Sequence, residues 1–176
     1  MKFEYKNLLP LNYSPSSRVW IYQSSRCFPI SEALQVEEIL SQFTKEWKSH
    51  GNEVQGTAYL FFGQFIIFMA DELATKISGC STDSSVRVIK EIEIALKVNL
   101  FDRNQLAFIV KDKIELLPLS QFNYAFSNKF ITNETLYFNN SVQSKTELEE
   151  SWIIPIQNSW LAKKIPPQHS TSSVSV

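Results

Sequence analysis

The chain has 176 residues and an almost balanced charge, with 17 Lys and Arg against 18 Asp and Glu. This length suits one domain with a real hydrophobic core. The charge balance provides no positive field that would attract nucleic acid or an anionic membrane. The chain contains four Gly, which argues against glycine-rich binding loops and against a repeat architecture.

The apolar runs of the sequence have the length of strands. The longest, YLFF and FIIFMA, fall far short of the ~18 residues that a membrane helix requires. The first residues, MKFEYKNLLPLNY, contain no apolar run of signal-peptide length. We therefore expect a soluble cytoplasmic protein without membrane insertion, in which Cys27 and Cys80 are free thiols.

The first part of the chain predicts an arm, a strand and a helix. Residues 1–17 carry two prolines and several polar residues and are expected to form an irregular arm. Side-chain types alternate over residues 18–23, RVWIYQ, which is typical of a strand. A helix follows Ser31, its expected N-cap, with apolar residues every three or four positions, and it ends at His50-Gly51.

The next part predicts a hairpin, a second helix and more strands. Two apolar, aromatic-rich runs within residues 54–71 flank the sequence FGQ, as in a hairpin. A second helical stripe extends to about Lys97, and strands are expected at 106–110 and 114–119. The sequence TLYFNN suggests an edge strand, and TELEESW a short helix.

The order strand, helix, strand, strand, helix, strand is that of a ferredoxin-like β-α-β-β-α-β core. We therefore predict a single α+β domain over residues 1–165, in which two helices cover one face of an antiparallel sheet and a C-terminal extension follows. Residues 166–176 are expected to form a disordered polar tail.

The stretch SGCSTDSS, which begins at Ser78, is the first candidate site. If the second helix begins near Thr82 or Asp83, the Cys80 thiol lies at or just before its N-terminus, where the helix dipole lowers a thiol pKa. Around it, the candidates for binding a ligand are Ser78, Ser81, Asp83 and Ser84. The alternative, which we favour, is a small buried thiol beside a cluster of capping residues.

Three other titratable residues are candidates for catalysis with Cys80. His50 is a candidate base for the thiol, although a surface histidine that caps the first helix is the simpler interpretation. Asp71 or Glu72 is a candidate for orienting the thiol, but adjacent strand residues point to opposite faces and do not form a catalytic pair. The expected groove therefore lies between the Cys80 turn, Asp71 and the end of the first helix.

Two further pairs have a structural and a functional interpretation. Trp152 and Trp160 would suit a protein-binding patch if they were exposed, but we expect both indoles to be buried. Asp102 and Arg103 are expected to form a loop salt bridge rather than a site.

Several motifs are absent from the sequence. It contains no phosphate loop, no G-x-G-x-x-G, no G-x-S-x-G, no C-x-x-C and no H-E-x-x-H. Two cysteines and two distant histidines make a poor zinc set, and the RNP1 pattern of RNA-binding modules is missing. We therefore expect no cofactor, no metal and no nucleic-acid partner.

Several short pieces of the sequence occur together: SRVWIYQSSR, EWKSHG, FMADE, SGCSTDSSVRVIKEIE, LFDR, FNN before ELEESW, and P-x3-SW. Their combination, over about Ser17 to Trp160, resembles a family of small bacterial proteins of unknown function whose members are often labelled as ABC transporter ATPases. The positions to which the resemblance points are Arg18, Trp20, Tyr22, His50, Asp71, Glu72, Cys80, Asp83, Arg103 and Trp160. Of these, Arg18, Tyr22, Arg103 and Trp160 complete the set of ligand-binding candidates.

Three functions follow as hypotheses. The first, which we favour, is a non-catalytic binding or accessory module for a protein partner or a small ligand. The second is a thiol-dependent enzyme or redox sensor that uses Cys80. The third is the ATPase that the resemblance implies, in a chain without a phosphate loop. The sequence does not decide whether the chain is an enzyme or in which oligomeric state it exists.

Overall fold

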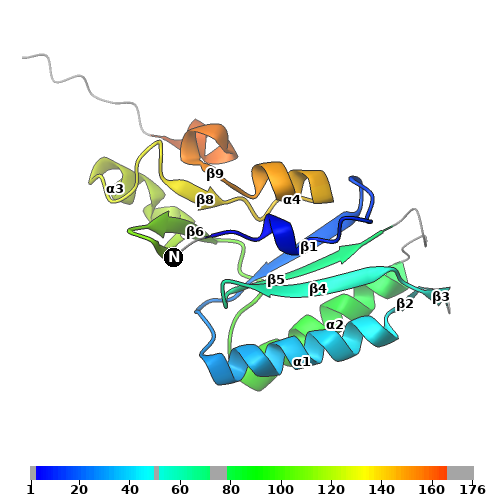
Figure 1. The fold of residues 1–176 in the computed structure, drawn as a ribbon. Helices are drawn as coiled ribbons and strands as arrows, with labels where there is room; N and C mark the ends of the chain where they lie inside the picture. Colours follow the sequence, from blue (N-terminus) through cyan, green and yellow to red (C-terminus); the bar gives the residue numbers. More distant parts are fainter. Residues whose placement is uncertain (1–2, 50–51, 72–78, 166–176) are drawn as a thin grey trace, which may run out of the picture.

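A computed structural model describes residues 3–49, 52–71 and 79–165 and shows an α+β protein (Figure 1). The strands within these ranges form a three-stranded sheet, a four-stranded sheet and a two-stranded ribbon, all antiparallel. The expected α+β class is thus confirmed. Residues 166–176, the expected tail, lie outside the described residues.

The three-stranded sheet has the order β1-β5-β4. β1 (Arg18–Gln23) and β4 (Gly56–Phe61) both pair with the central strand, β5 (Phe65–Ala70). The β4–β5 pair is the predicted hairpin, and its turn contains Phe62 and Gly63, which have φ angles of 57° and 63°. A positive φ costs glycine nothing, which explains why one of the four glycines stands here.

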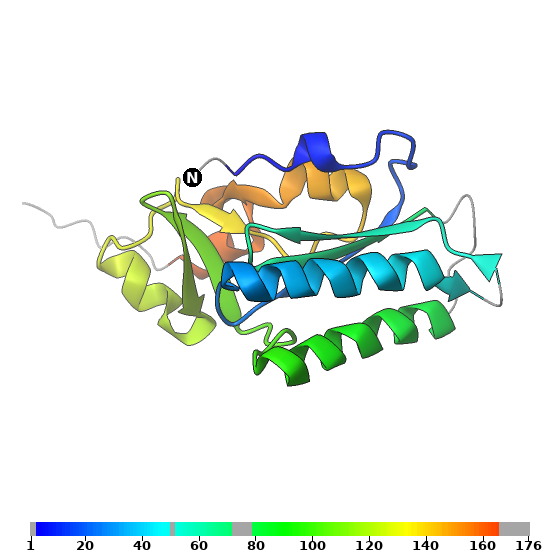
Figure 2. The same cartoon turned by 60° about the horizontal axis from the view of Figure 1, so that its bottom comes forward.

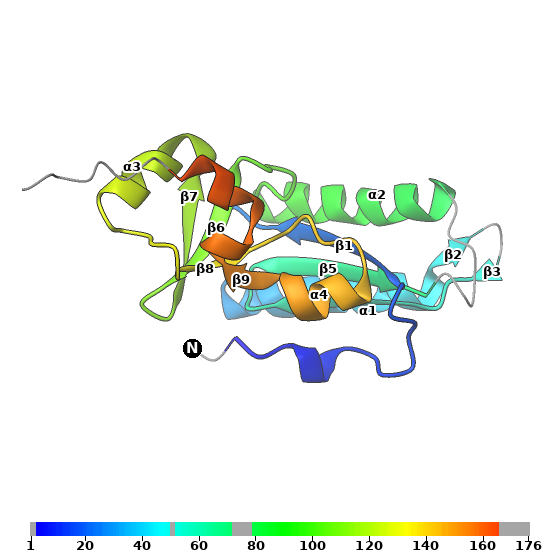
Figure 3. The same ribbon diagram turned by 90° about the horizontal axis from the view of Figure 1, so that it is seen from above.

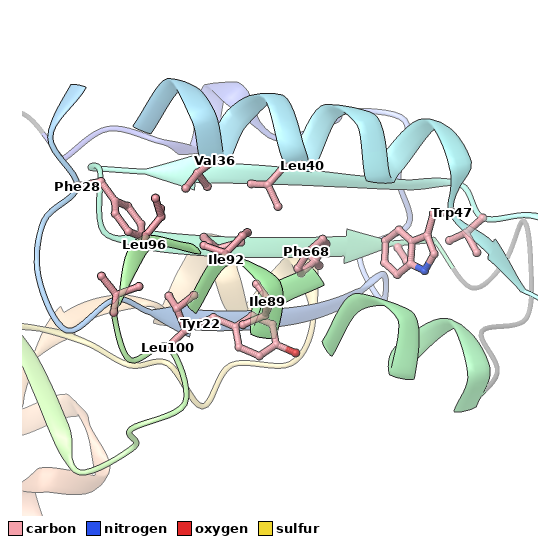
Figure 4. Close-up of a cluster of buried hydrophobic side chains, with 14 residues drawn as sticks. Tyr22, Phe28, Val36, Leu40, Trp47, Phe68, Ile89, Ile92, Leu96 and Leu100 are labelled. Atoms are coloured by element: carbon pink, nitrogen blue, oxygen red, sulfur yellow. The ribbon is translucent and has the colours of Figure 1, made fainter. Parts of the chain in front are cut away.

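Two long helices cover one face of this sheet. α1 (Ile30–Glu46) and α2 (Gly79–Leu96) lie side by side under the strands (Figures 1 and 2). Their apolar stripes meet the side chains of β1 and β5 that point toward them, as Figure 4 shows. The buried side chains of this cluster include Tyr22, Val36, Leu40, Trp47, Phe68, Ile89 and Ile92. The predicted arrangement of two helices on one face is therefore confirmed.

The opposite face of the sheet is buried as well. It is covered by the N-terminal arm, with its 3-10 turn η1 (Lys6–Leu8), and by α4 (Lys145–Ser151) (Figures 1 and 3). Tyr5 and Trp152 are almost fully buried there. As a result β5 is buried along its whole length on both faces, which explains its continuous apolar sequence.

The four-stranded sheet has the order β7 (Lys113–Pro118), β6 (Gln105–Val110), β8 (Leu136–Phe138), β9 (Ile153–Pro155). The fourth strand of the expected ferredoxin-like core, β6, lies in this sheet and not beside β1, so the ferredoxin-like topology is not confirmed. Together with α3 (Phe122–Ser127), η3 (Ile156–Asn158) and η4 (Trp160–Lys164), this sheet forms a third hydrophobic cluster of the protein. The remaining elements are β2 (Lys48–Ser49), β3 (Asn52–Glu53) and η2 (Leu119–Gln121).

The predicted limits of α1 are wrong at both ends. Its N-cap is Pro29 rather than Ser31, and the amide of Ala33 donates to the Pro29 carbonyl to close the first turn. The helix ends at Glu46, because Trp47 is extended and its carbonyl accepts a hydrogen bond from the amide of Val54. Tertiary pairing therefore ends the helix before the expected His50-Gly51, which lies outside the described residues.

The predicted start of α2 is also wrong. The helix already includes Gly79, so Asp83 lies inside it as an exposed residue rather than at its N-cap. Several adjacent residues, Ser81, Thr82 and Asp83, are all suited to an N-cap, and local chemistry does not choose between them. None of the helices described is long and apolar enough to cross a membrane.

Candidate functional site

Two adjoining pockets open along the outer edge of β1. Their volumes are about 230 and 220 Å³. They share five residues, which are Ile21, Tyr22, Arg103, Asn140 and Ser141. We call the two together the β1-edge groove. It is lined by β1, by the loop that follows α2, by the segment from β8 to α4, and by Trp160.

The segment between β8 and α4 is fixed against β1 at one end of the groove. The amide of Val19 donates to the carbonyl of Gln143, and the amide of Lys145 donates to the carbonyl of Ser17, each at 2.9 Å. In Figure 3 this segment passes beside β1. These two bonds enclose a single bridge between Arg18 and Ser144. The groove opens where the segment leaves β1.

The start of α4 holds the same segment in place. The side chain of Ser144 accepts a hydrogen bond from the amide of Glu147 at 3.2 Å. In return the Glu147 carboxylate accepts from the amide of Gln143 at 2.7 Å. This reciprocal pattern is a close variant of the capping box. It fixes the chain direction at the point where the groove begins.

A chain of side-chain hydrogen bonds crosses the other end of the groove. The indole of Trp152 donates to Asn140 Oδ1 at 3.0 Å, and Asn140 Nδ2 donates to Gln23 Oε1 at 2.8 Å. Gln23 Nε2 then donates to the carbonyl of Gln105 at 3.1 Å. These bonds satisfy polar groups that are largely buried. They also fix the side chain of Asn140, which lines both pockets.

Two aromatic side chains border the larger pocket. The indole of Trp160 donates to the hydroxyl of Tyr137 at 3.2 Å and remains 40% exposed. Burial raises the pKa of Tyr137, although the hydrogen bond from Trp160 opposes this. On the other side Phe101 is 38% exposed and packs edge-on against Tyr22. The pocket therefore offers accessible aromatic surface beside its polar groups.

The groove carries two arginines from distant parts of the chain. The guanidinium of Arg18 lies 5.2 Å from the centre of the Trp20 ring. Burial raises the pKa of Tyr22. A hydrogen bond with Ser85 and the charge of Arg103 act in the opposite direction and offset only part of this rise. The charge of Arg103 is thus felt at the Tyr22 hydroxyl. Arg103 has no carboxylate within ion-pair distance among the residues that the structure describes.

One carboxylate also lines the larger pocket, that of Asp102. It accepts a hydrogen bond from the amide of Asn104 at 2.9 Å. The expected salt bridge between Asp102 and Arg103 is not formed within the described residues. The groove is thus lined by two guanidinium groups and one carboxylate, and guanidinium groups are suited to binding an anionic ligand.

The groove is lined by six of the residues that the sequence analysis singled out, namely Arg18, Trp20, Tyr22, Asp102, Arg103 and Trp160. The sequence analysis missed Asn140, which lies in the quoted FNN sequence, and Gln23, which lies in the quoted SRVWIYQSSR. These two quoted pieces of sequence were therefore signals that could have identified Asn140 and Gln23.

Asp71 and the residues around Cys80 do not line this groove. Asp71 is buried and accepts a hydrogen bond from the amide of Ser14 at 3.2 Å, so it holds the N-terminal arm. Asp83 is exposed and Ser84 half-buried on α2. His50, Glu72 and Ser78 lie outside the described residues, as do the side chains of Cys80 and Ser81. The expected groove beside Cys80 therefore stays a prediction.

The two tryptophans near the C-terminus differ from each other. Trp152 is fully buried, whereas Trp160 is 40% exposed, so the expectation that both indoles are buried is wrong for Trp160. Of the two cysteines, Cys27 is a free and exposed thiol. Within the described ranges, His, Cys, Asp and Glu form no group that could hold a metal ion.

No family model, no curated protein and no solved structure matches the chain. The resemblance to the family of small bacterial proteins therefore rests on the quoted sequence pieces alone.

Proposed function

We propose that this protein is a non-catalytic binding module and that the β1-edge groove is the site of a small anionic ligand. One observation carries the proposal: Arg18 and Arg103, from different parts of the chain, line the same pocket. A guanidinium presents its N–H groups in a planar fork that matches carboxylate and phosphate. Asn140 and Ser141 add neutral hydrogen-bonding groups beside them.

The composition of the groove supports binding rather than catalysis. Its lining residues, all of which the structure describes, include no His, Cys, Lys or Glu. The tyrosines Tyr22 and Tyr137 have raised pKa values and stay protonated at neutral pH. General acid–base catalysis works best with a group that titrates near the working pH. Positioned donors without such a group are typical of a binding site.

The aromatic border suggests what the ligand contains besides its charge. Trp160 and Phe101 each expose more than a third of their surface at the larger pocket. A ligand with an apolar or planar part would cover this surface, and removal of apolar area from water favours binding.

The experiment is a thermal-unfolding titration with inorganic phosphate, acetate, citrate and benzoate. A ligand that binds the folded state raises the melting temperature. We expect at least one of these anions to raise the Tm of the wild-type protein. In the double variant Arg18→Gln, Arg103→Gln the rise should disappear, because a hydrogen bond to a charged group contributes about 1.5–3 kcal/mol.

Arg87→Gln is the matched control, since Arg87 is an exposed arginine of α2 that does not line the groove. Its response to each anion should equal that of the wild type. If no anion raises the Tm, or if the double variant responds as the wild type does, the groove is not an anion site and the proposal is wrong.

The second proposal is the thiol-dependent enzyme or redox sensor. It is favoured by the place of Cys80 in the first turn of α2, where unpaired backbone N–H groups stabilise a thiolate. The test is the pH dependence of Cys80 alkylation in a Cys27→Ser background, because Cys27 is itself an exposed thiol. An activated thiol titrates at about 7 or lower, and an ordinary value near ~8.5 would end this proposal.

A further inference from the structure

The backbone of β1 has hydrogen-bonding groups that face the groove. β1 is an end strand of its sheet, with β5 on its inner side. The amide of Ser24 donates to Gln64, in the turn before β5, whereas the amide of Val19 donates away from β5 to Gln143. Successive residues of an antiparallel strand point their backbone groups to alternate sides. Ile21 therefore points its N–H and C=O outward, as Val19 does.

The outward groups of Ile21 lie beyond the last backbone bond to the neighbouring segment. That segment pairs with β1 at Ser17 and Val19 and then leaves it. Both pockets include Ile21 in their lining. No described residue makes a hydrogen bond to these two outward groups of Ile21. An unpaired strand edge of this kind is a template for another extended chain.

The charges on the groove fit one end of such a chain. Arg18 and Arg103 line the pocket that contains Ile21, and Asp102 is engaged by the amide of Asn104. A peptide that pairs with a strand edge gains affinity from its main chain, and a free C-terminal carboxylate is a planar anion that suits a guanidinium. The pockets, of about 230 and 220 Å³, together reach the lower part of the ~300–1,000 Å³ range of ligand sites. This volume suits a short chain end.

We propose that the ligand of the β1-edge groove is the C-terminal end of an extended peptide. Its main chain pairs with the N–H and C=O of Ile21, and its terminal carboxylate is bound by Arg18 and Arg103. The apolar surface of Trp160 and Phe101 receives a side chain of the peptide. This inference rests on the proposed function, because it names the class of anion that the groove binds.

The test uses the full-length protein labelled with ¹⁵N and follows the backbone amide signal of Ile21 by NMR. The first probe is a mixture of random tetrapeptides with a free C-terminal carboxylate. The second is the same mixture amidated at its C-terminus, and the third is the same mixture N-methylated at the last peptide bond. Inorganic phosphate and acetate serve as small-anion probes, and Arg87→Gln and Arg103→Gln as variants.

We expect the free-carboxylate mixture to shift the Ile21 signal in the wild type and in Arg87→Gln. Amidation, N-methylation and Arg103→Gln should each weaken the response about tenfold or more, which corresponds to about 1.4 kcal/mol. Equal binding of the amidated mixture would overturn the role of the carboxylate. Equal binding of the N-methylated mixture would overturn pairing with β1.

The remaining outcomes separate this inference from the proposed function. If phosphate or acetate shifts the Ile21 signal and none of the peptide mixtures does, the groove is an anion site and the peptide inference is wrong. If no probe shifts the signal, both are wrong.

Discussion

The two faces of the three-stranded sheet are covered in different ways. On the first face, α1 and α2 lie close in sequence to the strands that they cover, and the whole cluster comes from residues 22–100. On the second face, the covering residues come from both ends of the chain, from Tyr5 to Trp152. The first face is a core with local connections, and the second is closed by segments far apart in sequence. The segment that helps close the second face also lines the β1-edge groove.

The comparison is tested most strongly by one large side chain from each face. Trp152 on the second face is 0% exposed, and Trp47 on the first is 2% exposed. We expect Trp152→Ala and Trp47→Ala each to lower the free energy of unfolding by about 3–5 kcal/mol, as truncation of a buried tryptophan does. Urea unfolding of both variants is the measurement.

A loss below about 1 kcal/mol for Trp152→Ala, with a full loss for Trp47→Ala, would show that the second face is not a core. Trp160→Ala is the control for the loss of an indole near the same end of the chain, because Trp160 is 40% exposed. Its effect should be clearly smaller than that of Trp152→Ala.

A smaller effect is expected from a close approach on the first face. A Cβ atom at Gly56 would lie 2.5 and 2.6 Å from Cε3 and Cζ3 of the Trp47 ring. Gly56→Ala should therefore cost about 1–3 kcal/mol by overpacking. The double variant with Trp47→Leu removes the clash, so the two changes should be non-additive in a double-mutant cycle. Additive effects would show that the ring does not limit this position.

The smallest effect concerns the pH dependence of the second face. Burial, and then the charge of Glu149, raise the pKa of Tyr5 to about 12 from 10.0. A phenol that is held protonated in the folded state adds stability below pH ~10, and this stability is lost as the pH rises from about 10 through about 12. Tyr5→Phe should therefore weaken the fall in stability over this range.

Denaturant unfolding at a series of alkaline pH values measures this slope. Tyr5→Phe also removes the hydrogen bond to the Leu148 carbonyl, which costs about 0.5–1.5 kcal/mol at neutral pH. The exposed Tyr124 provides the control, because Tyr124→Phe should leave the slope as it is in the wild type. A slope unchanged in Tyr5→Phe would contradict the burial of this hydroxyl.

Much of the first face is predictable from the sequence, because its elements carry their own signals. The stripe of α1 and the alternation in β1 follow the 3.6- and 2-residue periods. The hairpin follows from two apolar runs around a glycine. The partner of β6 has no such local signal, because an alternating pattern predicts that a strand forms but not which sheet edge the strand pairs with. For this reason the ferredoxin-like topology is not confirmed.

The short elements of the second sheet carry weaker signals. α3 has six residues and β9 has three, so neither shows a full period of its pattern. Phe122 of α3, and Ile156, which directly follows β9, are buried in the hydrophobic cluster of this sheet. Tertiary burial, which a single sequence does not display, decides these elements.

The sequence predicted individual residues of the candidate site but not that they lie together in one groove. The resemblance named Arg18, Tyr22, Arg103 and Trp160, but no pattern in the sequence connects β1 with the loop after α2 or with Asn140. Those positions meet because one end of β1 pairs with Gln143. A groove formed at the end of such a pairing depends on contacts across more than half of the chain.

The closure of the second face by distant segments has a consequence for synthesis on the ribosome. The three-stranded sheet, α1 and α2 leave the exit tunnel before α4 and Trp152, and domains form as their residues become available. Until residues 138–152 emerge, the inner side of Phe65, Ile67 and Met69 lacks Phe138, Leu148 and Trp152, which cover it in the folded protein, and the Tyr5 hydroxyl lacks its acceptor at Leu148. The nascent chain is therefore expected to pass through a stage in which this face of the sheet is only partly covered.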